Sequence, residues 1–210
     1  MGWMIRWLVA AALLLALPCS PALAKSKVDP AAIAAMIEKA KANDPATDML
    51  WLRRENSKAL GYIPPRWEDG GKAFDLLDKE PAKAVALAEG WLKVNPLDVD
   101  ANYLCEIAYD KLGRKDDEAR THNLLMALLQ SVMGGKNGKT PETAWNAVSV
   151  DEEYQILRLI GAKPKSQALL ADKGSHYDVM TVTRGDNGKE ITIHFNIDYF
   201  FDKQFEGLGL

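Results

Sequence analysis

Helix-ending residues divide the region 71–134 into short segments, and this pattern constrains the fold more than any other feature of the sequence. Proline follows Glu80 and again follows Asn95, and the residue before a proline avoids helical backbone. Gly113 and Gly134 close two further segments, because glycine readily adopts the left-handed conformation that ends many helices. The sequence therefore predicts four consecutive helices that pack in two pairs.

We expect these helices at 71–79, 81–94, 99–112 and 116–133. A stack of only two helix pairs leaves an apolar face open at each end, so it needs caps. An amphipathic helix at 30–42 is expected to supply one cap, and the chain after Gly134 the other. Residues 46–66 mix apolar and charged side chains and close on two prolines, so we expect irregular chain there.

The two helix pairs resemble the tetratricopeptide repeat, a helix-turn-helix unit that stacks into binding scaffolds. The positions that carry the resemblance are Ala84, Ala88, Asn95, Pro96, Tyr109, Gly113 and Ala119. The repeats are degenerate, because Cys105 and Glu106 stand where Leu-Gly is usual and one residue is inserted before Ala119. The resemblance implies a surface that binds a protein or peptide, whose identity the scaffold residues do not specify.

Beyond residue 134 the apolar pattern changes. A short strand is expected at 145–150, where Trp145 packs against the helices. Ser149, followed three residues later by Glu152, is a capping box that begins a helix ending at Gly161. A further extended run at 167–171 leads into a hairpin.

The hairpin has apolar residues in alternation on both of its strands. If Asn187-Gly188 forms a two-residue turn, Val182 pairs with Ile193, and the apolar residues of both strands share one face. The predicted class is therefore α+β, with two tetratricopeptide-like helix hairpins capped by an antiparallel β-meander with one helix. The expected segments are a signal peptide at 1–24, an N-terminal helix and irregular segment at 25–66, the helical repeats at 67–134, and a small meander domain at 135–210.

Several short strings in the second half of the chain resemble one bacterial exported family. They are AsnProLeuAspValAspAla at 95–101, LysThrProGluThrAlaTrp at 139–145, SerValAspGluGluTyr at 149–154, LysSerGlnAlaLeu at 165–169, HisTyrAspValMet at 176–180 and PheAsnIleAsp at 195–198. In order, from about Phe74 to Asp198, they are similar to the domain of unknown function 4919 family. The resemblance implies an envelope protein with repeat-like helices and a terminal meander, and it implies no activity or catalytic residue.

The N-terminus is typical of a secretory signal peptide. Arg6 precedes an uncharged apolar run at 7–17, and a small-x-small site ends at Ala24. The run is shorter than the roughly 20 residues that cross a bilayer as a helix, so cleavage is favoured over an uncleaved anchor. Cys19 leaves with this segment. We expect a mature protein that is periplasmic or secreted and has no membrane span.

Composition and spacing argue against several functions. Loss of residues 1–24 removes one arginine and takes the net charge from −3 to −4. The sequence has no basic stripe of the kind that nucleic-acid binding requires. Cys105 is then the single thiol and is expected in the core. The three histidines lack the spacing of a helical metal site, and no Gly-x-Ser-x-Gly occurs. No cofactor, metal or catalytic residue is predicted.

Two functions remain open at this point. In the first, a non-enzymatic module of the cell envelope grips an unknown protein or peptide in the inner groove of the helix pairs. Its expected contact residues are the polar positions Asn102, Glu106, Asp110 and Asn123. In the second, a hydrolase or small-ligand binder uses groups of the meander, namely His194, Asp198 and Asp178.

Overall fold

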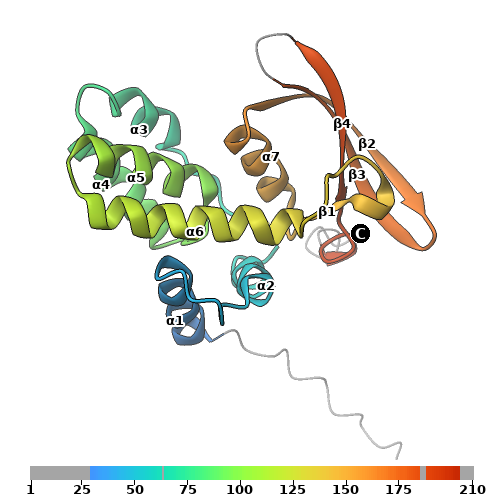
Figure 1. Ribbon diagram of the computed structural model, residues 1–210, viewed down its shortest axis with the longest axis horizontal. Helices are drawn as coiled ribbons and strands as arrows, with labels where there is room; N and C mark the ends of the chain where they lie inside the picture. The colour runs from blue at the N-terminus through green and yellow to red at the C-terminus, as the bar shows by residue number, and fades with distance from the viewer. Residues whose placement is uncertain (1–28, 63, 185–187, 204–210) are drawn as a thin grey trace, which may run out of the picture.

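The computed structural model describes residues 29–62, 64–184 and 188–203 and has the predicted α+β class (Figure 1). The helices are α1 (Pro30–Lys41), α2 (Met49–Ala59), α3 (Gly70–Leu76), α4 (Pro81–Leu92), α5 (Val99–Lys111), α6 (Lys115–Met133) and α7 (Val150–Leu159). A short 3-10 turn, η1 (Pro141–Thr143), precedes the sheet. The strands are β1 (Trp145–Asn146), β2 (Ala162–Asp172), β3 (Ser175–Arg184) and β4 (Lys189–Asn196). The expected signal peptide lies outside the described residues.

The central helices end within a few residues of the predicted positions, and the largest difference is at α3, which ends at Leu76 and not at residue 79. Pro81 begins α4, where its missing N–H leaves no helical hydrogen bond unmade. Gly113 and Gly134 follow α5 and α6 in left-handed backbone, with φ of 70° and 55°. At the start of α5 the side chain of Asp98 accepts a hydrogen bond from the backbone N–H of Ala101 at 2.9 Å. Helices α3 to α6 then pack side by side in chain order (Figure 1).

Residues 46–66 are not irregular throughout, because α2 lies within them. Its N-cap is Asp48, whose side chain accepts from the N–H of Trp51 at 2.9 Å. The buried face of α2 carries polar residues, Arg53, Asn56 and Ser57, beside its apolar ones. Hydrophobic periodicity alone could therefore not reveal this helix.

Arg53 attaches α2 to the rest of the protein and is only 1% exposed. Its Nε and Nη2 donate to the two carboxylate oxygens of Glu152 in α7, at 2.8 and 2.6 Å. Nη2 also donates to the carbonyl of Asn146 at 2.6 Å, and Nη1 to the hydroxyl of Ser131 at 3.0 Å. The buried guanidinium is thus paired with a carboxylate and satisfied by neutral acceptors, as a charge in an interior must be.

The sheet has the order β1-β4-β3-β2, with β1 parallel to β4 and the other pairs antiparallel. The predicted meander is therefore present, but two details differ. The strand expected at 145–150 is only two residues long, since Val150 already begins α7. Val182 pairs with Ile191 and not with Ile193, because Arg184 faces Lys189 and the connection is therefore centred one residue earlier than the Asn187-Gly188 turn assumed. Residues 185–187 of that turn lie outside the described residues.

The shift of two residues leaves the buried face of the hairpin unchanged, since side chains alternate with a period of two. Met180, Val182, Ile193 and Phe195 are all buried, as expected. Trp145 packs edge-on against Phe195, with ring centroids 5.7 Å apart, and its indole N–H donates to the carbonyl of Lys136 at 3.0 Å.

Two apolar clusters make up the interior. The larger one joins α1, α2, α6 and α7 to the sheet, and the smaller one lies among α3, α4 and α5. Cys105 is buried in the smaller cluster, as predicted, and burial raises the pKa of its thiol to about 12. No helix in the described part of the chain is long and apolar enough to cross a membrane.

Candidate functional site

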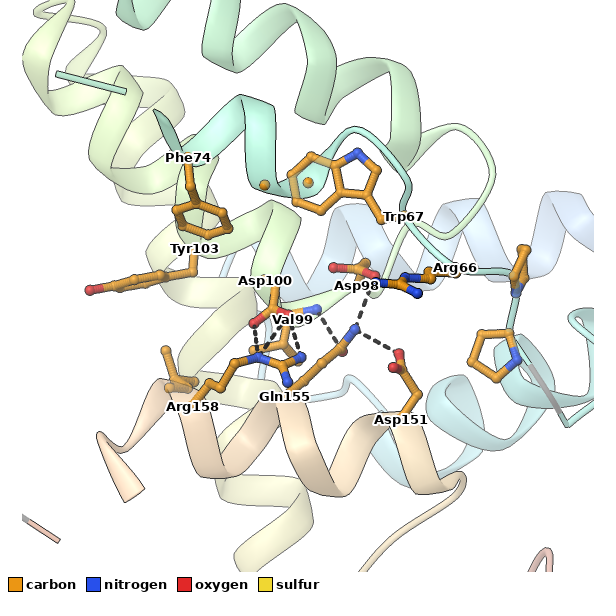
Figure 2. Close-up of a pocket in the computed structure, with 15 residues that line it drawn as sticks. Arg66, Trp67, Phe74, Asp98, Val99, Asp100, Tyr103, Asp151, Gln155 and Arg158 are labelled. Atoms are coloured by element: carbon orange, nitrogen blue, oxygen red, sulfur yellow. Dashed lines mark hydrogen bonds and ion pairs between the residues drawn. The ribbon is translucent and has the colours of Figure 1, made fainter. Parts of the chain in front are cut away.

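A cleft of about 800 Å³ opens where the two clusters meet. One side is the chain from Pro64 into α3, and the other sides are the start of α5 and the face of α7 that is turned toward α5 (Figure 2). This volume lies within the range of pockets that enclose small ligands or short peptide segments. The cleft is therefore the first place to look for a function.

Aromatic side chains form one wall of the cleft. Trp67 stacks on Trp91 with parallel rings 6.4 Å apart, and it meets Phe74 at 6.3 Å. Trp67 also lies directly on Gly70, where an added Cβ would stand 3.0 Å from the indole ring. Phe74 and Tyr103 are 39% and 40% exposed, which is high for large apolar side chains. The wall is thus rigid at Trp67 and open to an occupant at Phe74 and Tyr103.

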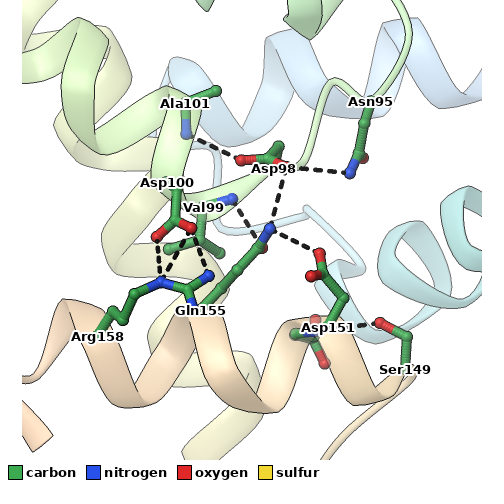
Figure 3. A network of polar contacts seen from close by, with 10 residues as sticks. Asn95, Asp98, Val99, Asp100, Ala101, Ser149, Asp151, Gln155 and Arg158 are labelled. Atoms are coloured by element: carbon green, nitrogen blue, oxygen red, sulfur yellow. Dashed lines mark hydrogen bonds and ion pairs between the residues drawn. The ribbon is translucent and has the colours of Figure 1, made fainter. Parts of the chain in front are cut away.

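A polar network centred on Gln155 forms the facing wall (Figure 3). The amide nitrogen of Gln155 donates to Asp98 at 3.0 Å and to Asp151 at 2.7 Å, so both of its hydrogens are used. Its amide oxygen accepts from the backbone N–H of Val99 at 3.1 Å. Gln155 therefore holds the start of α5 against α7 and fixes two carboxyl groups beside each other.

The surroundings raise the pKa of both carboxyl groups. For Asp98, which is 3% exposed, burial is the main cause, and the hydrogen bond from Ala101 acts against it. The nearby indole N–H of Trp91 also favours the charged form of Asp98, although this buried N–H makes no hydrogen bond of ordinary geometry among the described residues. Asp151 is exposed to the cleft, yet the surrounding protein removes enough water to raise its pKa to about 6. The negative charges of Asp98, Asp100 and Glu152 add to this effect, and Arg158 opposes it.

The charge of Arg158 is already matched by a neighbour. Its Nε lies 3.1 and 3.0 Å from the two carboxylate oxygens of Asp100, and its Nη2 donates to one of them as well. The remaining cation of the lining is Arg66, which is exposed and makes no ion pair among the described residues. Asp98 and Asp151 consequently have no ion-pair partner within that part of the chain.

The four predicted partner-binding residues do not line this cleft or form one open groove. Asn102 is buried, not exposed, because its amide donates to the backbone carbonyls of Pro96 and Asp98 at 3.1 and 2.8 Å. The amide of Asn123 donates to the backbone of Lys41 at 3.1 Å, so α1 covers that part of α6.

Glu106 and Asp110 lie nearer to solvent. Glu106 Oε1 is 2.7 Å from the Nδ1 of His122, and Asp110 pairs with Lys115. Glu106 and Asp110 therefore each have a local side-chain partner.

The residues of the alternative site are separated by the alternation of the strands. Asp178 pairs with Phe195 on the buried face, and the adjacent His194 points to the other face, where its Nδ1 lies 3.2 Å from the carbonyl of Gly138. Asp198 instead accepts from the backbone N–H of His176 at 2.7 Å. None of the three lines the cleft between α3, α5 and α7.

The structure also shows residues that sequence reasoning missed. Asp151, Gln155 and Arg158 follow the i, i+4, i+7 spacing of one helix face, and the correctly predicted start of α7 at Ser149 would have placed them together. No comparable signal brings Trp67 or Tyr103 to the same place. Among residues 29–62, 64–184 and 188–203, no group of three or more His, Cys, Asp or Glu side chains could hold a metal ion.

Residues 73–205 match the family model described as Domain of unknown function (DUF4919). The chain belongs to this family. The match begins inside α3, so it includes Phe74, the start of α5 and α7, but not Trp67 or Arg66. No curated protein and no solved structure matches the chain.

Proposed function

We propose that this protein is an exported, non-enzymatic binding protein that holds a peptide or protein segment in the cleft between α3, α5 and α7. One observation carries the proposal: the exposed aromatic side chains of Phe74 and Tyr103 lie across the cleft from the polar network that Gln155 holds in place. Large aromatic side chains supply contact area at low entropic cost, and a few placed polar groups orient what binds. An extended segment can use both at once.

The helical region supports a scaffold of the tetratricopeptide kind. Ala84 and Ala88 of α4 and Ala108 of α5 are fully buried, so their helices can approach closely. Tyr109 crosses from α5 to α4, where its hydroxyl donates to Glu89 at 2.9 Å. In this proposal the binding surface is not the groove that holds Asn102 and Asn123. It lies at the end of the stack, where α7 meets α5.

The bonding of two of the three cleft carboxylates favours binding over catalysis. Asp98 caps α5, and Asp100 holds Arg158, so both are engaged in maintaining the structure. The alternative hydrolase site gains no support, because Asp178 and His194 lie on opposite faces of the sheet and Asp198 is bonded to His176 and Asn196.

Export is inferred from the sequence alone. Arg6, the apolar run at 7–17 and the small residues before Lys25 form the signal, and they lie outside the described residues. A periplasmic or secreted location follows from this inference.

Site-specific photo-crosslinking in the native host tests the proposal. A photoreactive phenylalanine derivative replaces Tyr103 in the cleft, and in a matched control it replaces Leu169 on β2, which is 59% exposed and not part of the lining. We expect discrete adducts from position 103 that map to a defined peptide segment and disappear in the Trp67→Ala background. Absence of such adducts, or identical adducts from both positions, would rule out the cleft as the binding surface.

A further inference from the structure

We infer that the cleft selects a lysine or arginine side chain of the bound segment, with Asp151 as its ion-pair partner and the aromatic wall as its apolar support. This inference rests on the proposed function and narrows the chemistry of the occupant.

The hydrogen bonding of Asp151 is incomplete. One of its carboxylate oxygens accepts from Gln155 at 2.7 Å, and no hydrogen bond among the described residues reaches the other. Gln155 has no further hydrogen to give, because its second one is bound to Asp98. A carboxylate in a partly dehydrated cleft gains most from a charged donor. An occupant with N–H groups and a positive charge supplies one.

The charges of the lining also favour a basic occupant. Arg158 is paired with both carboxylate oxygens of Asp100, and no hydrogen bond among the described residues joins it to Asp151. Asp98 adds negative potential near Asp151, because both carboxyl groups accept hydrogen bonds from the amide nitrogen of Gln155. Asp98 itself is too buried to contact an occupant of the cleft. The lining carries three carboxylates, Asp98, Asp100 and Asp151, against Arg158 and the exposed Arg66, so an acidic segment is disfavoured beside Asp151. A purely apolar one would leave Asp151 dehydrated without a partner.

The aromatic wall favours a basic side chain as well. Trp67, Phe74 and Tyr103 present ring surface across the cleft from Asp151 (Figure 2). Aromatic faces attract cations, and the alkyl stems of lysine and arginine pack well on rings while the charged end reaches a polar group. Lysine and arginine combine the two properties that the facing walls require.

Selection from a random heptapeptide library on the purified full-length protein tests the inference. The peptides that bind are sequenced, and one of them is measured by fluorescence anisotropy against the wild type. It is then compared with the same peptide carrying norleucine for lysine or citrulline for arginine. We expect the enriched peptides to share a basic residue, and each uncharged replacement to weaken binding about tenfold or more, as for loss of one partly buried ion-pair partner.

Protein variants complete the test. Asp151→Asn is expected to weaken the binding of the basic peptide by a similar factor, and Asp151→Glu is expected to retain most of the affinity. Asp116→Asn makes an equal change of charge on the exposed start of α6, and it should change the affinity by no more than about twofold. Unchanged binding of the norleucine and citrulline peptides would overturn the basic-residue selection and leave peptide binding intact. If no selected peptide depends on Tyr103, as judged by Tyr103→Ala, the proposed function itself fails.

Discussion

The buried carboxyl group of Glu153 makes the stability of this protein depend on pH in a direction that can be predicted. Glu153 lies on α7 with no solvent exposure, and neither of its oxygens has an ordinary hydrogen-bond partner among the described residues. Its polar neighbour is Asp178 of β3, which also accepts from Gln167 at 2.6 Å. Burial, with the adjacent charge of Asp178, raises the pKa of Glu153 to about 10. The group is therefore protonated at neutral pH and can donate its hydrogen to Asp178.

The free energy of unfolding should fall as the pH rises. The unfolded chain releases this proton near the ordinary pKa of 4.5, whereas the folded chain keeps it. Each pH unit above that value then favours unfolding by about 1.4 kcal/mol. Glu153→Gln keeps the shape and a donor to Asp178 but removes the titration. Its second N–H lacks an acceptor, which costs about 1 kcal/mol. We expect the variant to be more stable than wild type by about 2 kcal/mol at pH 7 and by more at pH 9, with no gain near pH 5.

Urea unfolding followed by circular dichroism at pH 5, 7 and 9 measures this difference. Glu68→Gln, at an exposed site, is the control and should follow the wild type at every pH. If the free energy of unfolding of Glu153→Gln declines with pH as steeply as that of the wild type, Glu153 is not the buried proton carrier described here.

Three further predictions concern the anchor of α2, the cleft and the N-terminus. Arg53→Met should lower the free energy of unfolding by about 3–5 kcal/mol, because it leaves Glu152 unpaired in the interior. In thermal melts, Arg53→Met combined with Glu152→Gln should recover part of that loss. The affinity for a basic peptide should fall as the pH drops below about 6, where Asp151 becomes protonated. In Asp151→Asn the affinity should be lower and should not depend on pH over this range. Anisotropy titrations from pH 5 to 8 measure both. Intact-mass analysis of the protein recovered outside the cytoplasm should give a mature chain that begins at Lys25, and recovery of the uncut chain in the cytoplasm would contradict export.

The parts of the fold that follow local rules could be predicted from the sequence. Pro81 and the glycines at 113 and 134 end or begin helices through backbone restrictions that act within a few residues. Ser149 begins α7 for an equally local reason, since its hydroxyl accepts from the N–H of Glu152. The buried face of the hairpin was also predictable, because alternation survives a register shift of two residues.

The parts that depend on distant partners could not be predicted. Helix α2 buries Arg53, and that residue is stable inside only because Glu152, almost a hundred positions later, supplies a carboxylate. The cleft is of the same kind, since Trp67, Tyr103 and Asp151 come from three separate elements. Asn102 has the composition of a contact residue, but its bonds to the turn before α5 keep it buried. Polarity at a helical position does not reveal whether solvent or backbone satisfies it.

Nuclear magnetic resonance of the tryptophan indole N–H groups tests the central claim most directly. Trp67 lies in the wall of the cleft and stacks on Trp91. Trp145 belongs to the larger apolar cluster, and its indole N–H donates to the carbonyl of Lys136. Titration with a library-selected basic peptide is expected to shift the Trp67 and Trp91 signals and to leave that of Trp145 unchanged. A peptide that binds while the Trp67 signal stays in place would show that the cleft is not where this protein holds its partner.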